Sequence, residues 1–352
     1  MIGAMNFSQR RGKRIVVGID GGNSKVDVAL AMPDGTLLAA ERGPTVSHQA
    51  VGLETGMARL DSIVRSAAIR GGVIEWGPFD LVVASVAGAD YPSDVRQLRD
   101  AIQGLGIATE VVVVNDTIGA LRAGTSRSWG VGLVCGQGIN ASAIAPNGRM
   151  AGFPAVGDFA GDWGGGGGVG MAGLHAAVRG ADGRSPHTSL ERSVPAFFGL
   201  RRPAAVTHAL YVGKIPETRI SGLAPLVFAE AKAGDLIARS IVDRLAAELA
   251  AWATALIRRL HMTRLEVEVV LAGGVFRTHD HAFYAELERK IRLVAPLATL
   301  VHLQWPPVTG AVLLGLDRLA GGSADPESAT RLRAALGAWD TAVMARRGAV
   351  AT

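Results

Sequence analysis

The sequence predicts an α/β fold built from two similar lobes, and three observations support this prediction. Segments 14–40 (RIVVGIDGGNSKVDVALAMPDGTLLAA) and 129–153 (WGVGLVCGQGINASAIAPNGRMAGF) share one plan of strand, glycine-rich turn, strand and Pro-Asp-Gly or Pro-Asn-Gly turn. Helical patterns and buried strands alternate after each segment. The 352 residues, 49% of them hydrophobic, are enough for two cores. We interpret the repeated segment as a duplication.

In the first half, strands and helices alternate after the hairpin. Apolar residues at helical spacing predict helices over 53–68 and 91–105. Valine-rich runs predict buried strands over 80–87 and 110–115, and the second of these ends at Asn115-Asp116.

The second half is longer and more helical. Its patterns predict an amphipathic helix over 240–260, a buried strand over 265–272, a helix over 283–293 and a terminal helix over 325–346.

These elements suggest where the lobes begin and end. We expect residues 1–125 to form the N-terminal lobe, with helix 325–346 packing back on it, and residues 126–324 to form the C-terminal lobe. Ligands would then lie in a cleft between the lobes.

Composition excludes several classes of protein. No apolar run approaches the ~20 residues needed to cross a bilayer, and the N-terminal IVVGI stretch is shorter than the ~7 to 15 residues of a signal h-region. We therefore expect a cytoplasmic protein with no membrane partner. The net charge is +5, but the arginines are scattered, so we expect no nucleic-acid partner. The single cysteine, Cys135, excludes an internal disulfide and a multi-cysteine metal or iron–sulfur site within one chain.

The turn that follows the first strand has the residues of a phosphate site. Gly21 and Gly22 let backbone N–H groups approach an anion, and Ser24 and Lys25 add a hydroxyl and a positive charge. Asp20, at the end of the strand, is placed to hold Mg²⁺ through water. An ordinary β-turn remains the alternative for this segment taken alone.

A second glycine-rich turn occurs at the equivalent place in the repeated segment, at Gly136-Gln137-Gly138-Ile139-Asn140. Two such turns can clamp the phosphates of a nucleotide from both sides, and together they favour phosphate binding.

Two further strand ends carry candidate residues. Asp116 can accept the proton of an attacking hydroxyl, although an Asp that caps a helix starting at Thr117 is the alternative. Gly273-Gly274 lets a flat base lie against the backbone, although a plain strand-to-helix turn would also use glycine.

Together the motifs resemble the sugar-kinase, actin and Hsp70-like ATPases, and among them the BadF, BadG, BcrA and BcrD group, which includes N-acetylglucosamine kinase. The resemblance covers roughly residues 14–317 and rests on VVGIDGGNSK, VVVNDTIGA, GVGLVCGQGINASAI and VVLAGGVF. It implies a two-lobed actin-like fold whose lobes are ribonuclease H-like mixed sheets flanked by helices. It also implies ATP and Mg²⁺ as cofactors, a small-molecule sugar as substrate, and a homodimer.

The resemblance also implies roles for individual residues, with Asp116 as the catalytic base. The expected sugar ligands are Ser47, Asn115, Asp116, Ile139, Asn140, Ala155, Val156, Gly157, Asp162 and Trp163. The expected ATP ligands are Gly21, Gly22, Asn23, Ser24, Lys25, Gly136, Gln137, Gly138, Gly273 and Gly274, with Asp20 and Asp116 near the metal.

The chain departs from the family pattern at three places. Gly-Thr-Gly-Ser-Asn is Gly-Gln-Gly-Ile-Asn at 136–140, an Asn often found on the sugar is Ser47, and Gly-Asp-Glu-Gly-Ser is Gly-Asp-Trp-Gly-Gly at 161–165. The first departure replaces a hydroxyl at the phosphates by an amide, and the other two concern the sugar, so the identity of the sugar stays open.

The run GDWGGGGGVG at 161–170 is the most conspicuous of these departures. A linker would include Ser, Pro or charged residues. This run instead lies shortly after the second glycine turn and precedes an apparent helix over 169–178. We interpret it as part of the sugar site, with Trp163 as a wall; flexibility before substrate closure remains the alternative.

The leading hypothesis is an ATP-dependent kinase that phosphorylates an amino sugar, N-acetylglucosamine or glucosamine, at the 6-hydroxyl. Another acceptor, N-acetylmuramic acid or another hexose, is an alternative. Two other classes of function are an ATPase coupled to a partner protein and a nucleotide sensor without turnover.

Overall fold

The computed structural model describes residues 14–73 and 78–350. The chain divides into two compact units. The first contains the residues up to Gly130, residues 146–148 and the residues from Leu303 onward, and the second contains Val131–Ala145 and Arg149–His302.

The first unit is built on a five-stranded mixed sheet. The strand order is β3-β2-β1-β4-β5, in which β1 pairs antiparallel with β2 and parallel with β4. The elements of this unit are β1 (Val16–Gly21), β2 (Lys25–Ala31), β3 (Leu37–Pro44), α1 (His48–Val51), α2 (Leu53–Arg70), β4 (Phe79–Val86), α3 (Pro92–Gly104), β5 (Ala108–Asn115), α4 (Asp116–Gly124), α11 (Val308–Ala320) and α12 (Pro326–Val350).

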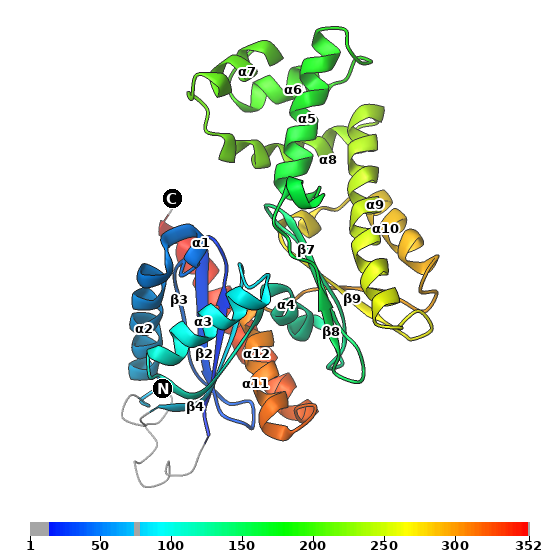
Figure 1. The fold of residues 1–352 in the computed structure, drawn as a ribbon. Coiled ribbons are helices and arrows are strands. Elements are labelled where there is room, and N and C mark those ends of the chain that lie inside the picture. The colour runs from blue at the N-terminus through cyan, green and yellow to red at the C-terminus, as the bar shows by residue number, and fades with distance from the viewer. Residues whose placement is uncertain (1–13, 74–77, 351–352) are drawn as a thin grey trace. The chain divides into compact units, whose positions relative to one another are not determined.

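Helices cover both faces of this sheet (Figure 1). Alternating residues of β1 point to opposite faces, as the strand period of two requires. Val17 packs toward α2 and α3, whereas Val16 packs toward α11 and α12. The sheet is therefore buried on both sides, which explains the valine-rich strands of the sequence.

Helix α11 lies in the first unit, which differs from the expected boundary at residue 324. Val312 and Leu316 of α11 belong to the same buried cluster as Leu81 of β4. Residues 303–324 therefore complete the first core, because the apolar face of α11 covers that sheet.

The second unit repeats the sheet and adds helices. Its strand order is β10-β9-β6-β7-β8, with β6 parallel to β9 and β7 antiparallel to β8. The elements are β6 (Gly130–Cys135), β7 (Ile139–Ile144), β8 (Met150–Gly152), η3 (Asp158–Ala160), α5 (Gly165–Ala181), α6 (Leu190–Phe197), α7 (Pro203–Tyr211), η4 (Glu217–Leu223), α8 (Ala224–Lys232), α9 (Leu236–Arg259), β9 (Glu268–Ala272), η5 (Gly274–Arg277), α10 (His281–Arg292) and β10 (Thr299–His302).

When the strands are numbered within each unit, both sheets have the order third, second, first, fourth, fifth. The predicted fold class of two related mixed sheets is therefore confirmed. The added helices α6 and α7 extend from α5 away from the second sheet (Figure 1). Within residues 14–73 and 78–350, the search for a helix of sufficient length and hydrophobicity to cross a membrane gave none.

Candidate active site

The turn between β1 and β2 is held in shape by its own backbone and by a neighbouring loop. The Gly22 amide donates to the Lys25 carbonyl at 2.9 Å and closes the turn. The Thr45 hydroxyl donates to the Gly22 carbonyl at 2.7 Å. Asn23 and Ser24 stay exposed at the tip, where they are accessible to a ligand.

Two predicted ligand-binding residues of this unit already bond to other protein side chains. Ser47 is buried, and its hydroxyl donates to the Asn23 side-chain oxygen at 2.7 Å, so it supports the turn. The Lys25 ammonium forms an ion pair with Asp27, which is fully buried. Lys25 must therefore share its charge between Asp27 and any phosphate.

Asp20 lies at the end of β1, beside this turn. Burial raises the pKa of the Asp20 carboxyl to about 7. Lys25 opposes this shift, and the charges of Asp27 and Asp116 add to it. The negative charge of Asp20 therefore destabilises the folded protein when no cation is bound.

Asp116 is the first residue of α4, and Asn115 caps that helix. The Asn115 side-chain oxygen accepts from the Thr117 amide at 3.1 Å, and its amide group donates to Asp90 at 3.0 Å. The alternative in which Asp116 caps a helix starting at Thr117 is therefore wrong. Burial raises the pKa of Asp116 to about 6, and the Asp90 charge adds to this shift.

The two raised carboxyls fit a hydrated divalent cation. Asp20 and Asp116 repel one another, and a cation near both would remove that cost. Among the described residues there is no group of three His, Cys, Asp or Glu that would coordinate a metal by side chains alone. Mg²⁺ in phosphate sites is usually held by one or two carboxylates, water and the phosphates themselves, so this donor set suits it.

In the second unit, the glycine run is the start of a helix. Helix α5 begins at Gly165 instead of the expected Val169, so the run is neither a linker nor an open loop. The amides of Gly166 and Gly167 donate to the carbonyls of Gly136 and Gln137, at 2.7 and 2.9 Å. The helix start is thereby bonded to the glycine-rich turn between β6 and β7.

Gly165 shows why this approach needs glycine. Its φ is +67°, and a Cβ there would lie 2.5 Å from the carbonyl oxygens of both Gln137 and Gly138. Any larger residue would push the helix start away from the turn.

A cavity of about 660 Å³ lies on one side of this turn. Gly136, Gln137 and Gly274, all predicted ATP ligands, line it. Pro225 and Phe228 of α8 give it an apolar wall suited to a flat base. The sequence reasoning missed this wall because α8 carries no recognisable motif.

Gly273 does not line this cavity and has a structural role. Its φ is +106°, and a Cβ would lie 2.4 Å from the Cys135 carbonyl of β6. The Cys135 side chain is fully buried, and burial raises the pKa of its thiol to about 12, consistent with the small apolar role of a buried cysteine.

A second cavity of about 580 Å³ lies on the other side of the turn. Five predicted sugar ligands line it, whereas Asn140 and Val156 do not, and Gly138 lines this cavity instead of the other one. The five are Ile139, Ala155, Gly157, Asp162 and Trp163.

Side chains that the sequence reasoning missed complete this cavity. His175, Glu217 and Arg244 line it from α5, η4 and α9. The Arg244 guanidinium lies 3.8 Å from the Trp163 ring centroid. Arg244 is 81 residues from Trp163 in the sequence and belongs to no motif, so only the fold brings them together.

Asp162 holds the loop that precedes the glycine run. Its carboxylate accepts from the Gly157 amide at 2.9 Å. This bond spans the η3 turn and fixes the carboxylate at the cavity.

Two sheets with the same strand order, each with a glycine-rich turn after its first strand, define the actin-like fold class. The chain belongs to the BadF/BadG/BcrA/BcrD ATPase family, whose model matches residues 17–315.

Characterised relatives and solved structures agree with this assignment. The chain is 26% identical over 302 residues to an N-acetylmuramic acid/N-acetylglucosamine kinase of Clostridium acetobutylicum, covering 86% of this chain and 98% of the relative. It is 25% identical over 318 residues to an N-acetyl-D-glucosamine kinase of Dictyostelium discoideum, covering 87% and 98%. A solved structure from Chromobacterium violaceum, described as a candidate N-acetylglucosamine kinase, is 23% identical with a TM-score of 0.66 over 86% of this chain and 98% of that one.

Proposed function

We propose that the protein transfers the γ-phosphoryl group of ATP to the 6-hydroxyl of an amino sugar, N-acetylglucosamine or glucosamine. Two relatives of similar length carry the names of N-acetylglucosamine kinases, one of them also acting on N-acetylmuramic acid. Membership of an ATPase family supports ATP as the donor.

The observation that carries the proposal is the environment of Asp116. Its carboxyl follows a buried parallel strand, and its pKa of about 6 leaves it ionised yet basic near neutral pH. A base with a pKa near the working pH transfers a proton efficiently. Asp116 accepts the proton of the sugar hydroxyl as that oxygen attacks the γ-phosphorus, and the β–γ bridging oxygen leaves with ADP.

On the nucleotide side, both glycine turns contribute to binding. The Gln137 backbone amide, the Ser24 hydroxyl and the Lys25 ammonium offset the phosphate charge. Mg²⁺, when bound, neutralises charge that develops between the β- and γ-phosphates, and Asp20 and Asp116 would hold its water shell. Gly274 and Phe228 would take the base.

On the sugar side, Asp162 accepts hydrogen bonds from sugar hydroxyls, and Trp163 lies against the ring. A buried acceptor left unpaired by the wrong isomer gives strong discrimination. Of the remaining predicted ligands, Ser47 would act through Asn23, which its hydroxyl supports. We further propose a homodimer in solution.

The other classes of function have less support. A partner-coupled ATPase that transfers electrons through an iron–sulfur cluster held by two cysteines from each chain would need a second cysteine, and Cys135 is the single one. A nucleotide sensor without turnover would need no base at the position of Asp116.

The test is a panel of hexoses and amino sugars with ATP and Mg²⁺, in which sugar-dependent ADP release is measured. N-acetylglucosamine, glucosamine, N-acetylmuramic acid, N-acetylmannosamine and glucose form the panel, and mass spectrometry of the product identifies the phosphorylated hydroxyl. Release of ADP that no sugar stimulates would contradict the proposal.

A further inference from the structure

Three neighbouring strands of the first sheet place charged residues in one row. Asp20 of β1 lies opposite Asp27 of β2, and Asp27 lies opposite Arg42 of β3. Residues directly opposite one another in antiparallel pairs carry their side chains on the same face. The row therefore runs from the candidate metal ligand to the edge of the sheet, on the face that α11 and α12 cover.

Arg42 is bound tightly within this row. Its Nε and Nη2 donate to the two oxygens of Asp27 at 2.6 and 2.8 Å, and Nη2 also donates to Asp340 of α12 at 2.7 Å. The Arg42 side chain is only 6% exposed, and its guanidinium carbon lies 5.2 Å from the Trp339 ring centroid. Helix α12 thus fixes the position of the guanidinium.

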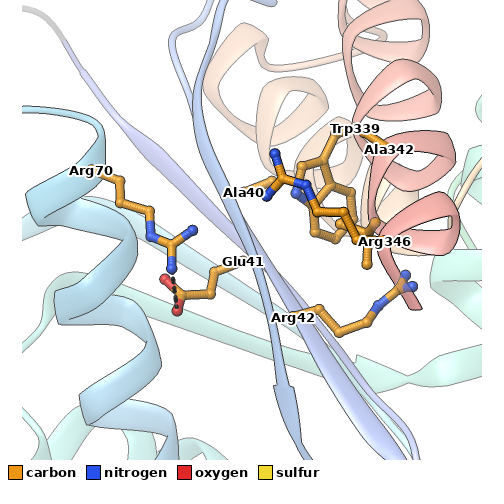
Figure 2. Close-up of a pocket in the computed structure, with 8 residues that line it drawn as sticks. Ala40, Glu41, Arg42, Arg70, Trp339, Ala342 and Arg346 are labelled. Carbon is orange, nitrogen blue, oxygen red and sulfur yellow. Dashed lines mark hydrogen bonds and ion pairs between the residues drawn. The ribbon is translucent and has the colours of Figure 1, made fainter. Parts of the chain in front are cut away.

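Figure 2 shows Arg42 on the α12 side of β3, with Glu41 and Arg70 on the other side. These residues, with Trp339 and Arg346, line a cavity of about 450 Å³ at the sheet edge. Asp340 is 35% exposed, so the outer partner of Arg42 can be changed without burying an unpaired group.

The charges of the row decide what Lys25 can do. Asp27 is fully buried and has two cationic partners, Lys25 and Arg42. If Arg42 lost its charge, Lys25 would be the sole cationic partner of Asp27 among the described residues, and Asp27 would hold the Lys25 ammonium more tightly. Less of the Lys25 charge would then be available to a phosphate.

We propose that Arg42 is a positioning residue of the kinase site, held by Asp340, that shares the charge of Asp27 and so leaves more of the Lys25 charge for a phosphate. The inference rests on the proposed function, because it assumes that Lys25 serves a Mg²⁺-nucleotide. Arg42 itself touches neither ligand.

The test measures binding of Mg²⁺ with the non-hydrolysable ATP analogue AMPPNP by calorimetry, without sugar. We expect Arg42→Gln to weaken binding by about tenfold and Asp340→Asn by about threefold. The double variant Asp27→Asn/Arg42→Gln removes both charges, so it should bind within about threefold of wild type. Affinities are compared for the folded protein only, with the folded fraction of each variant measured by circular dichroism, because removing the buried Asp27 charge would also restore a fold that Arg42→Gln weakens.

Arg331→Gln is the matched control. The Arg331 guanidinium of α12 donates to the backbone carbonyl of Asp34, in the turn after β2, at 2.9 Å and lies 3.5 Å from its carboxylate, so this contact holds the same helix to the same sheet without reaching Asp27. We expect wild-type affinity from Arg331→Gln. Equal weakening by Arg331→Gln and Asp340→Asn would show that general docking of α12 matters and would overturn the proposal.

Two further results would also overturn it: Arg42→Gln binding within twofold of wild type, or a double variant as weak as Arg42→Gln. Should Arg42→Gln fail to fold, Arg42→Lys, which keeps the charge but loses one of the two bonds, replaces it. We then expect Arg42→Lys to bind Mg²⁺-AMPPNP with an affinity between those of wild type and Asp340→Asn. Weaker binding by Arg42→Lys than by Asp340→Asn would count against the proposal. Because the readout needs no sugar, normal Mg²⁺-AMPPNP binding without any sugar phosphorylation would contradict only the proposed function, whereas a wild-type protein that binds no Mg²⁺-AMPPNP would contradict both.

Discussion

Arg244 stacks on Trp163, with its guanidinium carbon 3.8 Å from the ring centroid. Arg244 comes from α9 and Trp163 from the segment that precedes α5, so the pair joins two elements at the cavity proposed for the sugar. The family pattern has Glu where this chain has Trp163. The pair therefore gives this chain a wall of its own at that cavity.

Removing this wall should weaken sugar binding more than catalysis. We expect Trp163→Ala to raise the sugar KM about tenfold, and Arg244→Gln to raise it about threefold, because a cation–π contact contributes about 0.5–1 kcal/mol at an exposed site. The nucleotide KM should not change. Arg259→Gln is the control. Arg259 is on α9, like Arg244, and its guanidinium carbon lies 5.5 Å from the Phe153 ring centroid, but Arg259 does not line the cavity. An unchanged sugar KM in Trp163→Ala would remove Trp163 from the sugar site.

Asp116→Asn should reduce kcat by about 10²–10⁴-fold, because the amide cannot accept the hydroxyl proton. AMPPNP binding measured by calorimetry should persist. Asp100→Asn, an exposed carboxylate on α3, serves as the control. Turnover by Asp116→Asn at a tenth of the wild-type rate or more would exclude the role of base.

Activity should fall on the acid side of neutrality. Asp116 and Asp20 act as anions, and their pKa values of about 6 and about 7 mean that both are protonated below these values. We expect kcat/KM to decline as pH falls from 8 to 5.5. Raising Mg²⁺ should move the decline to lower pH, because a bound cation favours the ionised carboxylates. A profile that is flat down to pH 5 would contradict the assignment.

The same carboxyls should make the unliganded protein less stable at alkaline pH. Their folded pKa values lie above the ordinary value of 3.8, so their stabilising contribution is fully present below that value and is lost progressively as pH rises through the folded values of about 6 and 7. Relative to wild type, Asp20→Asn should gain on the order of 4 kcal/mol in unfolding free energy at about pH 8 and little at about pH 4. Chemical denaturation at both pH values measures this difference, and an equal gain at both would refute the account.

Gly165→Ala and Gly168→Ala should have opposite effects. At Gly165 the φ of +67° and the 2.5 Å approach to two carbonyl oxygens make a Cβ strained, so we expect a loss of roughly 2 kcal/mol or more and weaker nucleotide binding. At Gly168 a Cβ would meet its nearest atoms at 3.7 Å in a helical backbone, so alanine should gain up to about 1 kcal/mol. Thermal unfolding of both variants tests this prediction. Equal shifts in unfolding temperature would mean that the turn tolerates movement of α5.

The sequence predicted the elements whose evidence is local. The two glycine turns and the strand that ends at Asn115 were found because a short motif and a period of two determine them. The start of α5 was misplaced by four residues because glycine has low helix propensity, and the bonds from Gly166 and Gly167 to the β6–β7 turn outweigh that preference.

The features that the sequence did not reveal depend on contacts between distant residues. Arg244, Phe228 and α11 belong to no motif, and each finds its place only when the chain folds. The pairing of Lys25 with Asp27 is different. The two residues are two apart on a strand and therefore share a face, so alternation alone indicates that they meet.

The core formed by α11 and α12 has a consequence for synthesis on the ribosome. Val16, Ala29 and Leu81 are fully buried beneath helices that are translated after the second unit, which is nearly continuous in the chain. The second unit can therefore fold first, while one apolar face of the first sheet stays uncovered until α11 and α12 have been made. During that interval this face is the surface that a chaperone would need to protect from aggregation.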